Sequence, residues 1–199
     1  MNDTATNNDK LIGFLFLNLA YLLEQRGESI QYDRPYDGDP ELGFAITMFR
    51  VGRDAYDYAT RCFELMGKKV VRECGVTMSV SFDTHEENID FKNRFKLLMD
   101  RAEKELTEIG DRTPYEHYFL KSNPVIVGTE DGQNNHWIYL QAEIGDALDW
   151  EVRREILGDY EMTGDDGGTV KIMVSCYRKK WRDRMVRYLV DLGVEKIHP

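Results

Sequence analysis

The apolar residues of the chain begin with a dense segment, Leu11 to Leu23, inside a predicted helix from about Asp9 to Gln25. Apolar side chains surround nearly its whole circumference, which is typical of a helix buried in a core. This segment would rise only about 20 Å as a helix, against a bilayer core of about 30 Å, so no membrane span is predicted. The alternative role is oligomerisation, in which another chain covers this helix.

A second apolar face, with residues at spacings of three and four, runs from Phe44 to Met66. The Asp39-Pro40-Glu41 segment before it is a strong helix start, with Asp as the N-cap and Pro at the first helical position. We therefore predict a helix that extends to Met66, behind a loop at residues 31–40. The alternative for residues 44–49 is a short strand.

The hydrophobic period changes from 3.6 to 2 at residues 74–82, where apolar and polar residues alternate as in a half-buried strand. Thr84 and Glu87 then have the spacing of a capping box, which marks a helix start. This helix is predicted to extend to about Ile109. Residues 111–123 are predicted to be irregular.

The C-terminal part of the chain alternates between extended and helical patterns. Residues 124–127 and 136–144 predict an antiparallel hairpin, and Asp146 begins a predicted helix to about Leu157. The acidic, glycine-rich residues 161–168 predict a loop. A strand at 169–177 and a helix over about 178–192 complete the pattern, with predicted inward positions at Trp181, Met185, Tyr188, Leu189 and Leu192.

Alternation in the predicted strands leaves one sheet face polar, which favours an antiparallel sheet with helices on its other face. The predicted fold class is α+β, with a mostly antiparallel sheet of about four strands, helices packed on one face, and N-terminal helices. Segments 74–82, 137–144 and 170–177 are expected in this one sheet. Residues 1–8 are predicted to be a disordered tail and 9–199 a single domain, with 9–67 as an optional helical subregion. The sequence shows no repeat of fixed period.

Composition and charge narrow the class of protein. The 199 residues include 26 basic and 36 acidic side chains, and the net charge of −10 argues against a surface that binds nucleic acid or an anionic membrane throughout. The chain has three cysteines, an odd number that excludes a fully paired disulfide framework and suits a reducing compartment. A cytoplasmic location is therefore predicted.

Cys176 and Arg182 have the C-x5-R spacing of the phosphate-binding loop of cysteine-dependent phosphatases, a resemblance confined to these two residues. In that loop a thiolate attacks phosphorus, while backbone amides and the arginine hold the oxygen atoms. Residues 177–181 contain no glycine, which a backbone curled around phosphate normally requires. Cys176 is also in phase with the apolar residues of its strand, so we predict a buried structural cysteine.

Metal and nucleotide motifs are weak or missing in the sequence. Asp83, His85 and His136 are the strongest candidate metal ligands, because carboxylate and imidazole groups can bind a divalent cation. No HExxH or CxxC spacing accompanies them, and the capping box already accounts for Glu87. No EF-hand loop, Walker loop or GxGxxG turn is found, so no metal or other cofactor is predicted.

Basic residues are concentrated in the last predicted helix, where six of the 26 lie between positions 178 and 187. Arg178, Lys179 and Arg182 are predicted to lie off its inward stripe, as a docking face for an acidic partner. The alternative is a solvated helix face without a partner. Acidic loops form a second predicted surface, for a basic partner, at Asp37, Asp39, Asp165 and Asp166.

Together these patterns favour a non-enzymatic interaction protein over an enzyme. We predict a small acidic inhibitor or accessory protein, of the kind common in phage and mobile elements, that acts by binding a partner protein. The first alternative is a metal-dependent hydrolase or nuclease-like enzyme, whose site would bring Asp83, His85 and His136 together at one end of the sheet. The second alternative, less favoured because of the net charge, is a nucleic-acid binder that uses the basic C-terminal helix.

Overall fold

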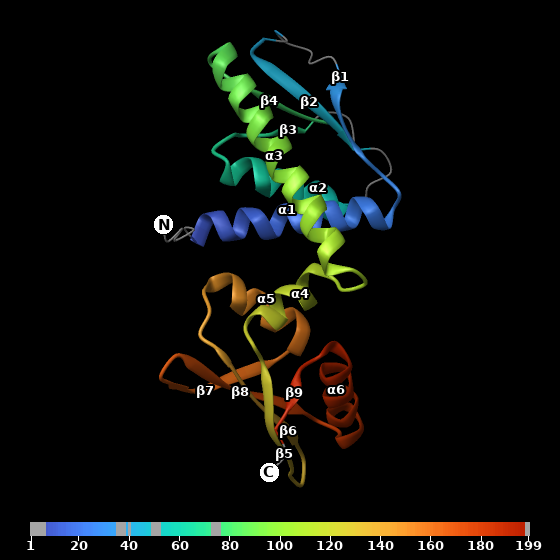
Figure 1. Cartoon of the computed structure of the whole chain (residues 1–199), viewed down its shortest axis with the longest axis vertical. Coiled ribbons are helices and arrows are strands. Elements are labelled where there is room, and N and C mark those ends of the chain that lie inside the picture. The colour runs from blue at the N-terminus through green and yellow to red at the C-terminus, as the bar shows by residue number, and fades with distance from the viewer. Residues whose placement is uncertain (1–6, 35–38, 40, 49–52, 73–76, 198–199) are drawn as a thin grey trace. The chain divides into compact units, whose positions relative to one another are not determined.

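The computed structural model describes residues 7–34, 39, 41–48, 53–72 and 77–197 (Figure 1). The chain divides into two compact units, Met1–Pro114 and Tyr115–Pro199, called unit 1 and unit 2 below. Each unit combines helices with a mainly antiparallel sheet, so the α+β prediction is confirmed. No helix in the described part of the chain is both long and apolar enough to cross a membrane.

Unit 1 is built around a four-stranded sheet in which every neighbouring pair of strands is antiparallel. Its described elements are, in chain order, α1 (Asn7–Gln25), β1 (Ile30–Arg34), β2 (Gly43–Met48), α2 (Arg53–Leu65), β3 (Val71–Arg72), β4 (Thr77–Ser81) and α3 (His85–Ile109). The strand order across the sheet is β1-β2-β4-β3.

Unit 2 is built around a five-stranded sheet. Its described elements are, in chain order, α4 (Pro114–Lys121), β5 (Val125–Asp131), β6 (His136–Glu143), α5 (Ala147–Leu157), β7 (Tyr160–Asp166), β8 (Thr169–Cys176), α6 (Lys179–Leu192) and β9 (Glu195–Lys196). The strand order is β7-β8-β6-β5-β9, and only β9 is parallel to its neighbour.

The two units share one topology. Each runs helix, strand, strand, helix, strand, strand, helix, and β9 is an addition to the second. If the strands of each unit are numbered in chain order, both sheets have the order 1-2-4-3 with antiparallel neighbours. Several corresponding elements begin at a similar separation along the chain, as Gly43 and His136 do for β2 and β6, or His85 and Lys179 for α3 and α6. The first helices, α1 and α4, begin further apart. The structure therefore contains a repeated topology, although the sequence contains no repeat of fixed period.

Helices supply much of the core of unit 1. The ring of Phe95 in α3 packs edge-on against Phe16 of α1 and Phe63 of α2, with centroid distances of 5.1 and 5.0 Å. Residues 14–20 of α1 are all buried, so the prediction of a core helix is confirmed. The buried amide of Asn18 donates a hydrogen bond to the carbonyl of Phe14, 2.8 Å away, which satisfies its Nδ2 inside this apolar segment.

The central strands of unit 2 follow the predicted alternation closely. In β6 and β8 every second side chain is buried on one sheet face, and α6 packs against these two strands. Leu140 lies opposite Ile172 in the register, so the buried residues of neighbouring strands meet. The buried side chains of this face are Ile138, Leu140, Ala142, Val170, Ile172 and Val174.

The long helix predicted to reach Met66 is wrong in its first part. Residues 43–48 form strand β2, and only residues 53–65 form helix α2. The alternative prediction, a short strand at residues 44–49, is confirmed for residues 44–48. The segment is rich in residue types that favour strands, and Ile46 pairs with Met78 of β4, so tertiary pairing overrides the helical spacing. Asp39 accepts a hydrogen bond from the amide of Glu41 in a turn, and Pro40 lies outside the described residues.

Three segments predicted to lack regular structure contain it. β1 lies in the predicted loop at residues 31–40, α4 in the predicted irregular segment 111–123, and β7 in the predicted loop at 161–168. Two of these errors come from strand pairing, because β1 pairs with β2 and β7 pairs with β8. The local composition of a segment does not indicate such a partner strand. In α4 proline occupies the first helical position, where its missing amide hydrogen costs nothing.

The assignment of all three predicted strands to one sheet is also wrong. β6 and β8 are neighbours in the sheet of unit 2, whereas β4, within the predicted strand 74–82, belongs to the sheet of unit 1. Residues 74–76 lie outside the described residues. Alternation identifies a strand, but not its neighbours. The prediction that this strand is half-buried is also wrong, because the polar residues Thr77 and Ser79 of β4 are buried as well.

Candidate functional site

Exposed aromatic and basic side chains gather where β8 leads into α6. Tyr177 is 77% exposed and Trp181 is 49% exposed. The guanidinium carbon of Arg178 lies over the Trp181 ring, 5.3 Å from its centroid, which is cation–π geometry. Lys180 is exposed in the same first turn. We call Tyr177, Arg178, Lys180 and Trp181 the aromatic–basic cluster.

The predicted inward stripe of α6 is therefore partly wrong. Leu189 and Leu192 are buried as predicted, but Trp181 and Tyr188 are exposed. Arg182 occupies the buried position near the start of the helix, with 8% of its surface exposed. Hydrophobicity alone predicts the stripe, whereas a buried arginine requires partners for its charge.

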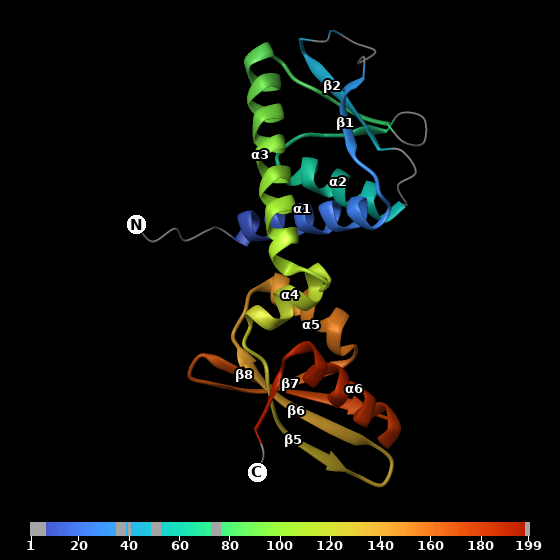
Figure 2. The same cartoon turned by 45° about the vertical axis from the view of Figure 1, so that its right-hand side comes forward.

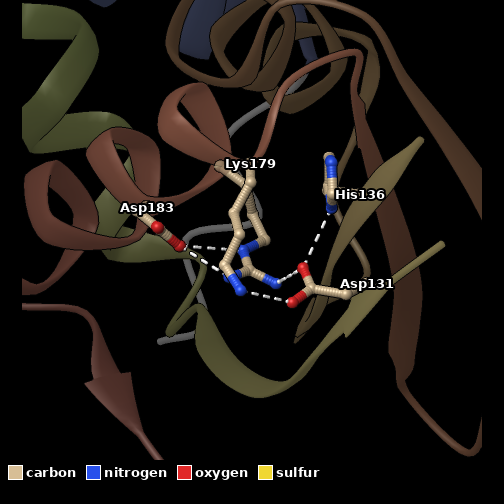
Figure 3. A network of polar contacts seen from close by, with 5 residues as sticks. Asp131, His136, Lys179 and Asp183 are labelled. Atoms are coloured by element: carbon tan, nitrogen blue, oxygen red, sulfur yellow. Dashed lines mark hydrogen bonds and ion pairs between the residues drawn. The ribbon is translucent and has the colours of Figure 1, made fainter. Parts of the chain in front are cut away.

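Those partners are carboxylates from two elements (Figure 3). Arg182 donates from Nη1 to Asp131 at the end of β5, and from Nε and Nη2 to Oδ1 of Asp183, at 3.0 and 2.6 Å. Lys179 also donates to Asp131, with 2.7 Å between Nζ and Oδ2. Nδ1 of His136, the first residue of β6, lies 2.9 Å from Oδ1 of Asp131.

This network corrects the predicted docking face. Of its three residues, Arg182 is an internal ion-pair partner, Lys179 is exposed but bonded to Asp131, and Arg178 is exposed on the Trp181 ring. Reversing all three charges is therefore expected to destabilise unit 2.

The network also explains the ionisation of Asp131. Hydrogen bonds from Lys179 and then His136 hold the pKa of its carboxyl below the ordinary 3.8, and the Arg182 charge acts in the same direction. Because Asp131 is ionised at neutral pH, it places a negative charge at the N-terminal end of α6. That end has no side-chain cap and no acidic residue in its first turn.

Cys176 has the environment of a structural cysteine. It is buried, and burial raises the pKa of its thiol above the ordinary value, with the charge of Arg182 opposing this effect. Arg182 is directed to Asp131 and Asp183. A protonated thiol is a weak nucleophile, so the geometry agrees with the rejection of a phosphatase loop.

The candidate metal ligands are divided between the two units. Asp83 and His85 lie at the start of α3 in unit 1, whereas His136 lies in unit 2 and is bonded to Asp131. The predicted Thr84 cap is confirmed, because its hydroxyl accepts from the Glu87 amide at 3.2 Å. The Glu87 carboxylate returns to the amide of Asp83, one residue before the N-cap. Within the described ranges, no three His, Cys, Asp or Glu side chains are close enough to hold a metal ion.

The predicted acidic loops are separate features. Asp39 is exposed in unit 1, and Asp37 lies outside the described residues. Asp165 and Asp166 belong to β7 of unit 2, where the backbone of Asp165 is paired with Val170. Sequence reasoning missed Asp131 as a partner of Arg182, because no local motif links residues so far apart. It also missed Asp183, although this residue directly follows Arg182, because a charged pair at adjacent positions does not predict burial.

Comparison with known proteins adds no relative, because no protein-family model and no curated protein matches this chain. Function has therefore to be inferred from the surface chemistry of the molecule. The aromatic–basic cluster is the feature with the most distinctive chemistry among the described side chains.

Proposed function

We propose that this protein is a non-enzymatic interaction module that binds an acidic partner protein through the aromatic–basic cluster. The exposure of Tyr177 and Trp181 beside Arg178 carries the proposal. Tyrosine, tryptophan and arginine are the residue types that contribute most to binding energy at protein interfaces. An inhibitor or accessory protein in the cytoplasm is the role that we propose, and the buried free thiols of Cys62 and Cys176 suit a reducing compartment.

The charge around the cluster supports an acidic partner. Arg178 and Lys180 lie at the N-terminal end of α6, where the helix dipole adds a partial positive charge. The chain as a whole carries a net charge of −10, so this is a positive region on an acidic protein. Complementary charge accelerates association and selects partners, while the aromatic rings supply the apolar contact area.

The network under the cluster supports binding in a second way. Lys179 and Arg182 tie the first turn of α6 to Asp131 of β5. This connection fixes the direction from which Tyr177 and Trp181 are presented. A binding surface that is held before the partner arrives loses less conformational entropy on association.

A nucleic-acid strand is the alternative ligand that the same residues could bind. Aromatic rings stack on bases and basic side chains pair with phosphates, so the cluster has both of the required groups. The overall negative charge favours a protein partner instead. The hydrolase alternative has less support, because its three candidate residues do not belong to one sheet.

The proposal is tested by comparing two variants as bait in a lysate of the source organism. Tyr177→Ala/Trp181→Ala removes the exposed rings, whereas Trp150→Ala removes a ring of similar exposure, 47%, from α5. We expect one or more acidic proteins to bind the wild type and Trp150→Ala, to be lost from the double variant, and to dissociate as salt is raised. Equal capture by all three baits would contradict the proposal.

Folding and nucleic-acid binding are measured on the same proteins. Because Trp181 is half exposed, its replacement by alanine is expected to change the free energy of unfolding by at most about 1 kcal/mol. A fluorescent single-stranded oligonucleotide distinguishes the alternative. Salt-dependent binding of the oligonucleotide that the double variant loses, together with no protein partner, would replace the proposal with the nucleic-acid alternative.

A further inference from the structure

The outer edge of β5 is only partly covered by β9. β9 pairs with Val125 and Ile126, and the amide of Ile197 donates to the carbonyl of Ile126 at 3.0 Å. From Gly128 to Asp131 no described strand lies on this edge, although β6 pairs with the other side of the strand (Figure 2). An uncovered edge presents backbone groups that another strand can pair with.

A groove of about 380 Å³ runs between α6 and this edge. Thr129 lines it from β5, while Val186 and Val190 line it from α6, and the Arg182–Asp183 pair is also part of the lining. Thr129 lies opposite Ile138, so it is on the sheet face that α6 covers. A strand added to the edge of β5 would direct alternate side chains into this groove, because successive side chains of a strand point to opposite faces.

The free charges of the groove are positive. Arg187 of α6 and Lys196 of β9 line it, and both are exposed. Neither has an ion pair within the part of the chain that the structure describes. The charge of Arg182, in contrast, is already balanced by Asp131 and Asp183. An occupant with carboxylates would pair with Arg187 and Lys196, and an apolar side chain would contact Val186 and Val190.

We propose that the free edge of β5 binds an extended acidic segment of the partner protein as an added strand. This rests on the proposed function, because it assigns a binding mode to the same acidic partner. The edge runs toward Asp131, which is bonded to Lys179 at the start of α6. The added strand would therefore follow β5 toward the aromatic–basic cluster. A peptide fits this edge because its backbone supplies the matching N–H and C=O groups, which a nucleic-acid backbone does not.

The proposal is tested by nuclear magnetic resonance on the full chain with synthetic peptides of five Glu-Val repeats as probe. We expect saturable shifts over residues 128–131. Slower hydrogen exchange is expected at the amides of Thr129 and Asp131, because alternate residues of β5 direct their backbone groups away from β6. A Lys-Val peptide of the same length is expected to bind at least about tenfold more weakly, since its charge is reversed. A Glu-Val peptide that is N-methylated at every residue should not bind, because it lacks the backbone donors of a strand.

Charge reversal in the groove gives the matching test on the protein. Arg187→Glu/Lys196→Glu is expected to weaken binding of the Glu-Val peptide at least about tenfold, whereas Arg154→Glu, on α5 and outside the groove, should change it less than about twofold. Shifts at the aromatic–basic cluster without shifts in β5 would overturn the added strand and leave the proposed function standing. No peptide binding in the groove, or equal binding of both peptide charges, would also overturn it.

Discussion

The two units have one topology but begin their last helix in opposite ways. In unit 1, α3 starts with the Thr84 cap and has Glu86 and Glu87 in its first turn. In unit 2, the N-cap residue of α6 is Arg178, which makes no side-chain cap hydrogen bond, and the first turn contains no acid. The negative charge that a helix start favours comes instead from Asp131 of β5. The same architecture can therefore carry opposite surface charge at corresponding positions, and function depends on those residues and not on the fold.

The cores of the units differ as well. Unit 1 packs phenylalanine rings from three helices together, and α3 alone spans 25 residues. Unit 2 relies more on branched aliphatic residues along β6 and β8, and its first helix, α4, has only 8 residues. All three tryptophans, Trp137, Trp150 and Trp181, lie in unit 2. Tryptophan fluorescence therefore reports on unit 2, while circular dichroism reports on both units.

The largest effect is expected from Phe95→Ala in unit 1. Phe95 is fully buried between Phe16 and Phe63, so its loss should reduce the free energy of unfolding by about 3–5 kcal/mol. Leu97→Ala, at a position 50% exposed on the same helix, should cost no more than about 0.5 kcal/mol. Both are measured by denaturant titration with circular dichroism.

The same titration, followed by tryptophan fluorescence, tests the prediction of a single domain. If residues 9–199 unfold as one domain, the fluorescence midpoint of Phe95→Ala moves together with the circular dichroism midpoint. If only the circular dichroism midpoint moves, the two units unfold independently and the single-domain prediction is wrong.

The next effect is expected from Arg182→Met in unit 2. The substitution leaves Asp131 and Asp183 without their buried partner, and we expect a loss of about 2–3 kcal/mol because both carboxylates are partly exposed. Arg184→Met, at an exposed position of the same helix, is the control and should be nearly neutral. Fluorescence-detected denaturation measures both. A loss no larger than that of the control would contradict a structural role for the network.

A smaller, pH-dependent effect is expected at Asp131. The pKa of the Asp131 carboxyl is lower in the folded protein than in the unfolded chain, where it is about 4. The ionised carboxylate therefore stabilises unit 2 at pH values above about 4. This stabilisation is lost as the pH falls through the lower pKa of the folded state. Asp131→Asn should therefore destabilise unit 2 at pH 7 and lose less stability than the wild type on acidification to pH 3. Asp191→Asn, an exposed acid of α6, is the control. Parallel pH profiles for wild type and Asp131→Asn would contradict the assignment.

The last prediction concerns the reactivity of one buried cysteine in each unit, and not stability. Burial raises the pKa of both Cys62 and Cys176, so both should react slowly with a water-soluble thiol reagent in the native state. Cys62 has no exposed surface and Cys176 has 9%, so Cys62 should react more slowly. Mass spectrometry of a Cys74→Ser variant measures the two rates. Fast labelling of Cys176 would reopen the phosphatase hypothesis.

Local patterns were enough to predict several elements. The apolar segment at residues 11–23, the Thr84–Glu87 capping box and the Asp146 cap marked α1, α3 and α5, because a helix is made of contacts within one segment. Alternation likewise identified the buried faces of β6 and β8. The α+β class followed from these elements alone.

The tertiary structure decided what depends on distant residues. Residues 43–48 became a strand because β4 pairs with them, and the repeat of one topology is visible only in the strand order. Arg182 is buried and Trp181 exposed because Asp131, 51 positions from Arg182, accepts the arginine's hydrogen bond. Strand pairing and buried ion pairs depend on which segments meet in space, and a local sequence window holds only one of the two partners.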